Sequence, residues 1–80
     1  MIPNPLADRI TAQPGVLGGK ATIRGLRISV EQILRALGNG VPEEDLLADY
    51  PELTLEDLRA AQLYAAERLA EERLFPIAAA

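Results

Sequence analysis

The 80-residue chain contains no cysteine, no histidine and no tryptophan. Without cysteine there are no disulfides, and without either cysteine or histidine there are no metal sites that use thiolate or imidazole ligands. Nucleophile–base pairs that need these residues are excluded as well, and no other set of side chains suggests catalysis. We therefore expect a protein that is not an enzyme and that uses no cofactor, metal or small-molecule substrate.

Long hydrophobic runs are also missing. No stretch approaches the ~20 apolar residues that a transmembrane helix needs, and residues 1–5 lack the basic and apolar parts of a signal peptide. We therefore expect a cytoplasmic protein that does not associate with membranes. A chain of this length forms one domain with one small core. Because such a core stabilises a fold only modestly, we expect a homodimer or a bound partner to reinforce it.

Charge is distributed unevenly along the chain. Residues 1–40 carry five basic residues against two acidic ones, whereas residues 41–80 carry three against ten, so the net charge of −4 hides a basic first half. A basic half can approach a polyanion that an acidic half repels. A solvated surface with uneven charge explains the same composition, and the sequence leaves both interpretations open.

Two helices are predicted in the middle of the chain. Ser29, with Gln32 three residues later, forms a capping-box pattern, and the apolar residues that follow recur at helical spacing up to Gly38. A second, short helix begins at Pro42, whose fixed φ suits a first helical position. It is predicted to stop near Tyr50, because the residue before a proline disfavours helical geometry.

The third predicted helix is the longest. Thr54 is a good N-cap residue, and the helix is predicted to run to about Leu74, just before Phe75-Pro76. Its leucines and alanines spread over about half of the helix circumference, whereas an ordinary surface helix needs a stripe of only ~100°. The surplus indicates that part of this helix faces another chain, or that the helix packs on both the other helices and the strands.

Short strands are predicted ahead of the helices. Residues 9–12 form one candidate, and residues 21–28 alternate apolar and polar side chains around Gly25 like a strand pair or a bulged ribbon. We expect a flexible leader at 1–8, a single domain at 9–75 and a frayed end at 76–80. The predicted fold is mainly α: a three-helix helix-turn-helix core, homeodomain-like or winged-helix-like, with a short N-terminal β-ribbon.

A helix-turn-helix core suggests DNA binding. A recognition helix normally presents Arg, Lys, Asn or Gln in its first turn, but here that turn holds Glu56 and Asp57. We therefore expect the basic ribbon to supply most of the attraction to DNA. The DNA-binding candidates are Lys20, Arg24, Arg27, Arg59 and Gln62. The competing interpretation is that Arg24 and Arg27 pair with acidic residues of the C-terminal half.

Residues 14–21 superficially resemble a phosphate-binding loop. The Walker pattern requires glycine where Pro14 stands and a hydroxyl side chain where Ala21 stands. Both requirements fail, so no nucleotide is expected.

Six segments carry a family resemblance. They are Pro14-Gly15-Val16, Gly18-Gly19-Lys20, Ile23-Arg24-Gly25, Arg27-Ile28-Ser29-Val30, Val41-Pro42-Glu43-Glu44 and the run from Asp49 to Leu58. Within residues 9–64 their order resembles DUF433, a bacterial domain family of unknown function. The family pattern usually has proline at position 21 and threonine at position 26, where this chain has alanine and leucine. The resemblance implies a helix-turn-helix protein.

For some members the resemblance implies the antitoxin half of a type II toxin–antitoxin pair, whose toxin is a PIN-like nuclease. We therefore expect an antitoxin-like regulator that binds such a toxin and represses its own operon at operator DNA. An acidic helix end suits a ribonuclease with a basic RNA cleft. The partner-binding candidates are Glu67, Leu69, Glu71, Glu72 and Leu74. The alternative is a protein-interaction module that acts as a dimer and does not bind DNA.

Overall fold

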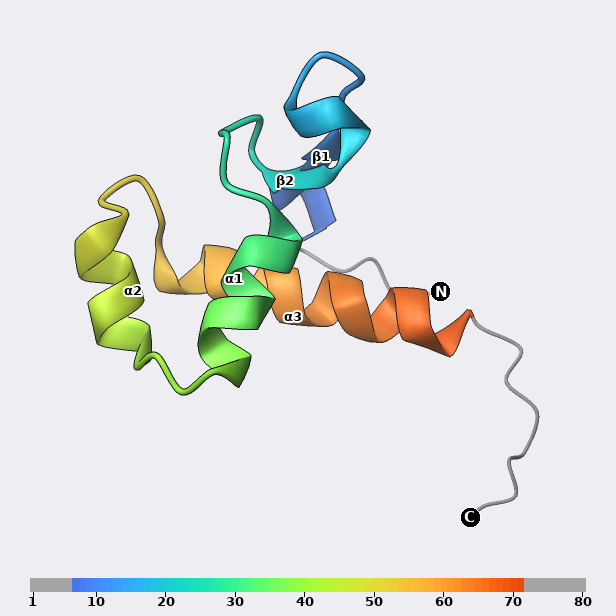
Figure 1. The fold of residues 1–80 in the computed structure, drawn as a ribbon. Helices are drawn as coiled ribbons and strands as arrows, with labels where there is room; N and C mark the ends of the chain where they lie inside the picture. The colour runs from blue at the N-terminus through green and yellow to red at the C-terminus, as the bar shows by residue number, and fades with distance from the viewer. Residues whose placement is uncertain (1–6, 72–80) are drawn as a thin grey trace, which may run out of the picture.

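The computed structural model describes residues 7–71 of the chain. This part is mainly helical, with α1 (Val30–Gly38), α2 (Glu43–Asp49) and α3 (Leu55–Ala70), and the strands β1 (Ile10–Ala12) and β2 (Ala21–Ile23) form a two-stranded antiparallel ribbon before the helices (Figure 1). Single turns of 3-10 helix, η1 (Ala7–Arg9) and η2 (Leu17–Gly19), precede the two strands. The predicted fold of three helices with a short N-terminal ribbon is confirmed.

The ribbon pairs different segments from those that the sequence suggested. Ile10 lies opposite Ile23, so the turn around residues 14–19 separates the two strands. The segment after β2 does not form a full strand, although the Ile23 N–H donates to the Ile28 carbonyl over 3.0 Å and Thr22 forms an isolated bridge with Ser29. Residues 7 and 8, which we assigned to the leader, belong to η1, which lies against α3.

Side-chain caps begin two of the helices. The Ser29 Oγ accepts the Gln32 N–H over 2.9 Å at the start of α1, but the Gln32 side chain donates to the Tyr50 hydroxyl instead of completing a capping box. The complete box is at α3, where the Thr54 Oγ1 accepts the Asp57 N–H and the Asp57 carboxylate accepts the Thr54 N–H. The predicted starts of α1 and α3 are therefore confirmed, and the box lies at α3. The second helix begins at Glu43, because Pro42 has an extended ψ of 148° and is the N-cap residue instead of the first helical residue.

The described part of α3 ends at Ala70, with Glu71 as its C-cap residue. The predicted helix end near Leu74 lies outside the described residues. Within residues 7–71, no helix combines the length and apolar character needed to cross a membrane.

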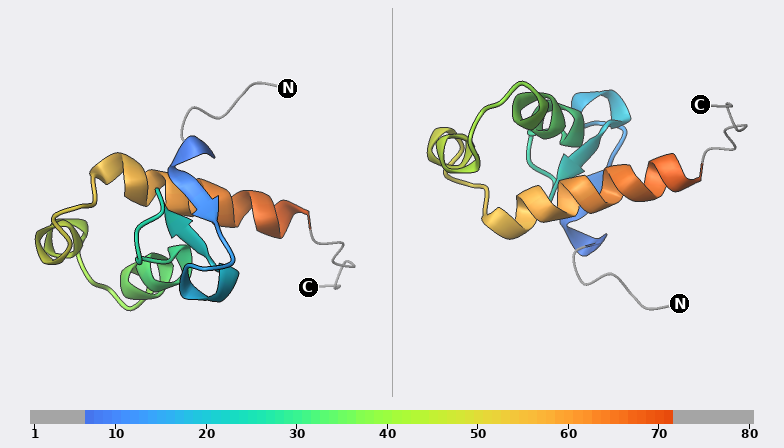
Figure 2. Two further views of the ribbon diagram at one scale, coloured as in Figure 1. Left: turned by 90° about the horizontal axis from the view of Figure 1, so that it is seen from above. Right: turned by 90° about the horizontal axis from the view of Figure 1, so that it is seen from below.

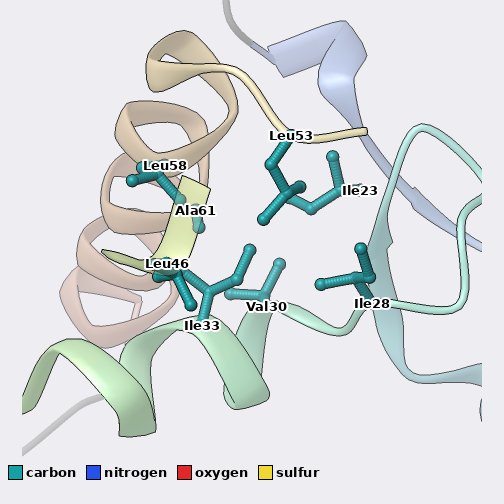
Figure 3. Close-up of a cluster of buried hydrophobic side chains, with 8 residues drawn as sticks. All are labelled: Ile23, Ile28, Val30, Ile33, Leu46, Leu53, Leu58 and Ala61. Atoms are coloured by element: carbon teal, nitrogen blue, oxygen red, sulfur yellow. The ribbon is translucent and has the colours of Figure 1, made fainter. Parts of the chain in front are cut away.

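Buried side chains from β2, from two loops and from all three α-helices meet in one core (Figure 3). The cluster consists of Ile23, Ile28, Val30, Ile33, Leu46, Leu53, Leu58 and Ala61. The core packs the ribbon and α1 against the first half of α3. The second half of α3 extends past α1 and the ribbon (Figure 2), so much of its surface is left for other contacts.

A tight turn follows β2. The Leu26 N–H donates to the Ile23 carbonyl over 2.7 Å, and the two central residues, Arg24 and Gly25, have φ values of 48° and 74°. Two left-handed central residues are the mark of a type I′ turn. Gly25 adopts this backbone freely, whereas a residue with a Cβ atom is strained there by about 1–2 kcal/mol. Arg24 therefore needs other contacts to hold it in place.

We expect Gly25→Ala to lower the free energy of unfolding by about 1 kcal/mol, because the new Cβ atom is strained at positive φ. The loss would come from the backbone alone, since no atom lies within 4 Å of the position that a Cβ would occupy. Urea denaturation measures it. Gly15→Ala is the matched control, because Gly15 is equally open and is not left-handed. Equal losses in the two variants would contradict the strain.

Candidate functional site

The Asp57 carboxylate is completely buried, with 0% of the residue exposed. It accepts the Thr54 N–H over 2.9 Å, the Arg9 Nη1 over 2.9 Å, and both the Nε and Nη2 of Arg24 over 3.1 and 2.9 Å. Arg24 Nη2 also donates to the Glu52 carbonyl over 2.6 Å. One carboxylate thus joins η1, the turn after β2 and the start of α3. We call Asp57, Arg9 and Arg24 the carboxylate clamp.

Two opposing effects act on the ionisation of Asp57. Burial raises the pKa of this carboxyl, but hydrogen bonds from Arg24, from the Thr54 backbone and from Arg9 outweigh the burial and hold the pKa below its usual value. The same contact raises the pKa of Arg24. The clamp is therefore ionised at neutral pH, and its acceptor oxygens already have partners within the protein.

The carboxylate clamp includes Arg24, which is one of the predicted DNA-binding residues. Arg24 is held at a left-handed φ by its two bonds to Asp57 and by its own N–H, which donates to the Arg9 carbonyl over 2.7 Å. For Arg24 the sequence left two interpretations open, contact with DNA or pairing with an acidic residue of the C-terminal half. The structure shows the pairing, with Asp57. Arg27 differs, because it is exposed and takes part in none of the ion pairs within residues 7–71.

The remaining DNA candidates lie in different places. Lys20 pairs with Glu31 of α1 over 3.0 Å. Arg59 pairs with Glu43 of α2 over 2.6 Å and donates to Gln62 over 3.2 Å. With Arg24 bound at the start of α3, the basic candidates contact three different helices, and most of their charge is matched by a neighbouring carboxylate.

A groove of about 620 Å³ runs between α1 and the second half of α3. Its apolar lining consists of Ala21, Val30, Leu34, Tyr64, Ala65 and Leu69. Its charged rim consists of Lys20, Glu31, Arg35 and Arg68. We call this surface the α1–α3 groove. It offers an apolar floor that is bordered mainly by positive charge.

The rim charges are partly paired. Glu31 accepts from Arg35 over 2.6 Å and from Lys20 over 3.0 Å, and these bonds, chiefly the one from Arg35, lower the pKa of its carboxyl. Arg68 lies 3.5 Å from Glu71. Because Glu31 is shared by two cations, the groove lining keeps an excess of positive charge.

The structure separates the predicted partner-binding residues. Leu69 lines the groove and is 61% exposed, and Glu71 pairs with Arg68 of the rim. Glu67 is exposed but does not line the groove. Glu72 and Leu74 lie outside the described residues. One of the five candidates thus belongs to the groove itself.

Several residues of these sites were not singled out from the sequence. Thr54 followed three residues later by Asp57 was a visible signal for a capping box, but nothing near it indicated that Arg9 and Arg24 would bury the carboxylate. Ala65 falls in the apolar arc predicted for the third helix, whereas Tyr64 lies outside that arc. Their position opposite Leu34 depends on how α1 crosses α3, which no local pattern reveals.

Among residues 7–71 no three acidic side chains group closely enough to hold a metal ion, and every buried side-chain polar atom in that part has a hydrogen-bond partner. Three helices on a two-stranded ribbon, with an open groove beside the core, define a small helix-turn-helix-like domain.

The chain belongs to the family described as "Protein of unknown function (DUF433)", whose model matches residues 10–65. The family that the sequence motifs predicted is therefore confirmed.

Two other proteins resemble this chain, one in sequence and one in both sequence and structure. It is 34% identical over 56 residues to the uncharacterized protein y4eO of Sinorhizobium fredii (strain NBRC 101917 / NGR234), a match that covers 70% of this chain and 25% of that protein. It is 43% identical, with a TM-score of 0.74, to the crystal structure of a DUF433 member protein from Anabaena variabilis ATCC 29413, over 81% of this chain and 64% of that one. The chain thus spans a quarter of the curated relative and less than two thirds of the solved one.

We expect Asp57→Asn to lower the free energy of unfolding by about 2 kcal/mol, because it leaves two arginines without their shared charged acceptor. Urea denaturation at neutral pH measures the loss. Glu56→Gln is the matched control, since Glu56 is exposed and lies 3.8 Å from Arg9 in a surface pair, and such pairs contribute little.

The difference in the free energy of unfolding between Asp57→Asn and the parent protein should also depend on pH. The pKa of Asp57 is lower in the folded chain than in the unfolded one. The stability that it adds is therefore complete above the ordinary carboxyl pKa of about 4 and is lost as the pH falls through the folded pKa. A difference in unfolding free energy that stays constant down to about pH 3 would contradict the ionised clamp.

Proposed function

We propose that this domain is a protein-docking module of antitoxin type, which seats a segment of a partner protein in the α1–α3 groove. The observation that carries the proposal is the apolar floor of that groove. Leu34, Tyr64 and Ala65 are half-buried and Leu69 is largely exposed, although the rest of the core is closed. A partner that removes this surface from water gains roughly 25 cal/mol for each Å² of apolar area buried.

Charge around the groove favours one kind of partner segment. Lys20, Arg35 and Arg68 border the floor, against Glu31 as the acidic residue of the lining. Complementary charges at an interface select the partner and speed its association more than they tighten binding. The groove therefore fits an apolar segment with carboxylates at its edges.

The family resemblance suggests which partner this is. In an antitoxin-like role the segment belongs to a PIN-like nuclease, and binding neutralises that enzyme. Glu67 and Glu71, on the same half of α3 as the groove, add negative charge that suits a basic RNA cleft. In this proposal the domain acts by binding alone and catalyses no reaction.

The binding prediction uses two adjacent alanines on α3. Ala65 lines the groove and Ala66 does not. We expect Ala65→Glu to weaken binding to a purified PIN-like nuclease partner by about tenfold or more, because it places a charge on the apolar floor. Isothermal titration calorimetry measures the affinity, and an RNA-cleavage assay measures neutralisation.

Ala66→Glu is the matched control for groove binding and should leave that affinity unchanged. Arg68→Glu gives a second test at the exposed rim, where reversing the charge should slow association with an acidic segment. Circular dichroism confirms that each variant folds. Full binding by both Ala65→Glu and Arg68→Glu would exclude the groove as the docking site.

One observation favours a second function, DNA binding that represses the operon. Arg27 is exposed and joins none of the ion pairs within the described residues, so its charge is available to a phosphate. Lys20 lies on the same N-terminal half, although Glu31 holds it. Contacts of this kind position a protein on DNA without reading its sequence.

The DNA-binding function predicts selective binding to the DNA upstream of the gene, weaker at physiological than at low salt and weaker again in Arg27→Ala. Fluorescence anisotropy measures it. Arg27 is the residue to change, because replacing Arg24 would break the carboxylate clamp as well. Binding that is equal for scrambled DNA, or absent at both salt concentrations, would exclude operator binding by the free protein and leave the docking role.

A further inference from the structure

The outward face of α3 carries apolar side chains that no part of residues 7–71 covers. Leu55 is 46% exposed and Leu63 is 42% exposed, and Ala66 and Ala70 are exposed as well. At about 100° per residue these four positions fall within an arc of roughly 80°, and Arg59 lies in the middle of that arc. We call these five residues the outer stripe.

The outer stripe is a different surface from the α1–α3 groove. Ala65, which lines the groove, points about 120° away from the centre of the stripe. The stripe also faces away from the core, because the buried Asp57, Leu58 and Ala61 occupy the other side of α3. Leu69, the groove residue nearest the stripe, points about 80° from the centre of the stripe. An occupant of the stripe therefore leaves most of the groove open.

We infer that the occupant of the outer stripe is a second copy of this chain, with its α3 antiparallel to the first. The positions of the stripe are spaced symmetrically along the helix: 55 and 70, and likewise 59 and 66, lie at equal distances from a point beside Leu63. In an antiparallel two-fold pair each large side chain of the stripe other than Leu63 therefore lies opposite a small one of the other copy, and the same contacts occur twice, as in an isologous interface. In this register each Leu55 lies against the small Ala70 of the other copy, and the two Leu63 side chains meet at the centre.

Charge complementarity supports the same register. Arg59 lies opposite the small Ala66 of the second copy, which leaves room for its guanidinium to reach Glu67, the next residue on that helix. In the single chain Arg59 already pairs with Glu43 over 2.6 Å. The exchange of one exposed pair for another changes the energy little, so the arginine sets the register while the leucines supply the attraction.

The size of the outer stripe limits the affinity that we expect for the dimer. α3 has 16 residues, which correspond to about 24 Å of helix. A contact confined to one face of a helix this short belongs with small interfaces, which are typical of weak and transient association. The dimer should therefore dissociate on dilution.

Sedimentation velocity across a wide range of protein concentration tests the self-association. We expect a concentration-dependent dimer whose dissociation constant rises by about tenfold or more in Leu63→Glu, because the substitution buries two carboxylates at the centre of the contact. Leu69→Glu is the matched control, because Leu69 is more exposed but lies outside the stripe. A monomer at every concentration, or equal effects of both substitutions, would overturn the inference.

Disulfide cross-linking tests the relative orientation of the two α3 helices. Because the chain contains no cysteine, only the introduced cysteines can form cross-links. Under mild oxidation, Leu63→Cys should form a disulfide with its own copy. Leu55→Cys should cross-link with an Ala70→Cys chain but not with itself, because two Leu55 positions lie about 20 Å apart along antiparallel helices. An efficient Leu55→Cys homodimer would indicate parallel helices and overturn the register.

A charge swap tests the role of Arg59. Arg59→Glu should weaken the dimer, and adding Glu67→Arg in the same chain should restore it. None of these three experiments involves a nuclease, so a failure to detect the dimer would leave the proposal of groove docking intact. Loss of nuclease binding in Ala65→Glu likewise leaves the outer stripe untouched.

Discussion

The position of the Asp57 carboxylate determines how the parts of this small fold are joined. Two arginines and one backbone N–H compensate its burial, and without them a buried carboxylate would lose the water that stabilises its charge. The clamp fixes the start of α3 beside η1 and holds Arg24 in a strained turn. The clamp thus sets where η1 and the turn after β2 lie against the start of α3, while the hydrophobic core packs α1 against the same helix.

The sequence predicts those features of the fold that depend on neighbouring residues. Ser29 and Thr54 mark the starts of α1 and α3 correctly, because capping acts within one helical turn. Pro42 lies one residue before α2, as its N-cap residue, and not at the first helical position that was predicted for it. The ribbon pairing could not be predicted in the same way. Ile23 lies opposite Ile10 of β1 on one side, while its N–H donates to the Ile28 carbonyl on the other, and the alternating pattern alone does not say which side forms the longer strand pair.

The candidate sites were less predictable because they depend on contacts between distant segments. In the sequence Asp57 is one of two acidic residues in the first turn of the third helix, and its burial follows from Arg9 and Arg24, which lie far from it in sequence. The surplus apolar arc of the third helix was visible. The structure divides that arc into a buried part, a part in the groove and an outer stripe, because α1 covers only one side of α3.

The bond from Arg9 to Asp57 spans 48 positions of the chain. Both α1 and α2 lie inside the loop that this contact closes. Closing this loop costs conformational entropy before the bond can form, and α1 and α2, with 9 and 7 residues, are too short to be stable helices on their own. Both helices therefore gain their stability as the two ends of the loop meet, and the rate of folding should follow that encounter more than the formation of any single helix.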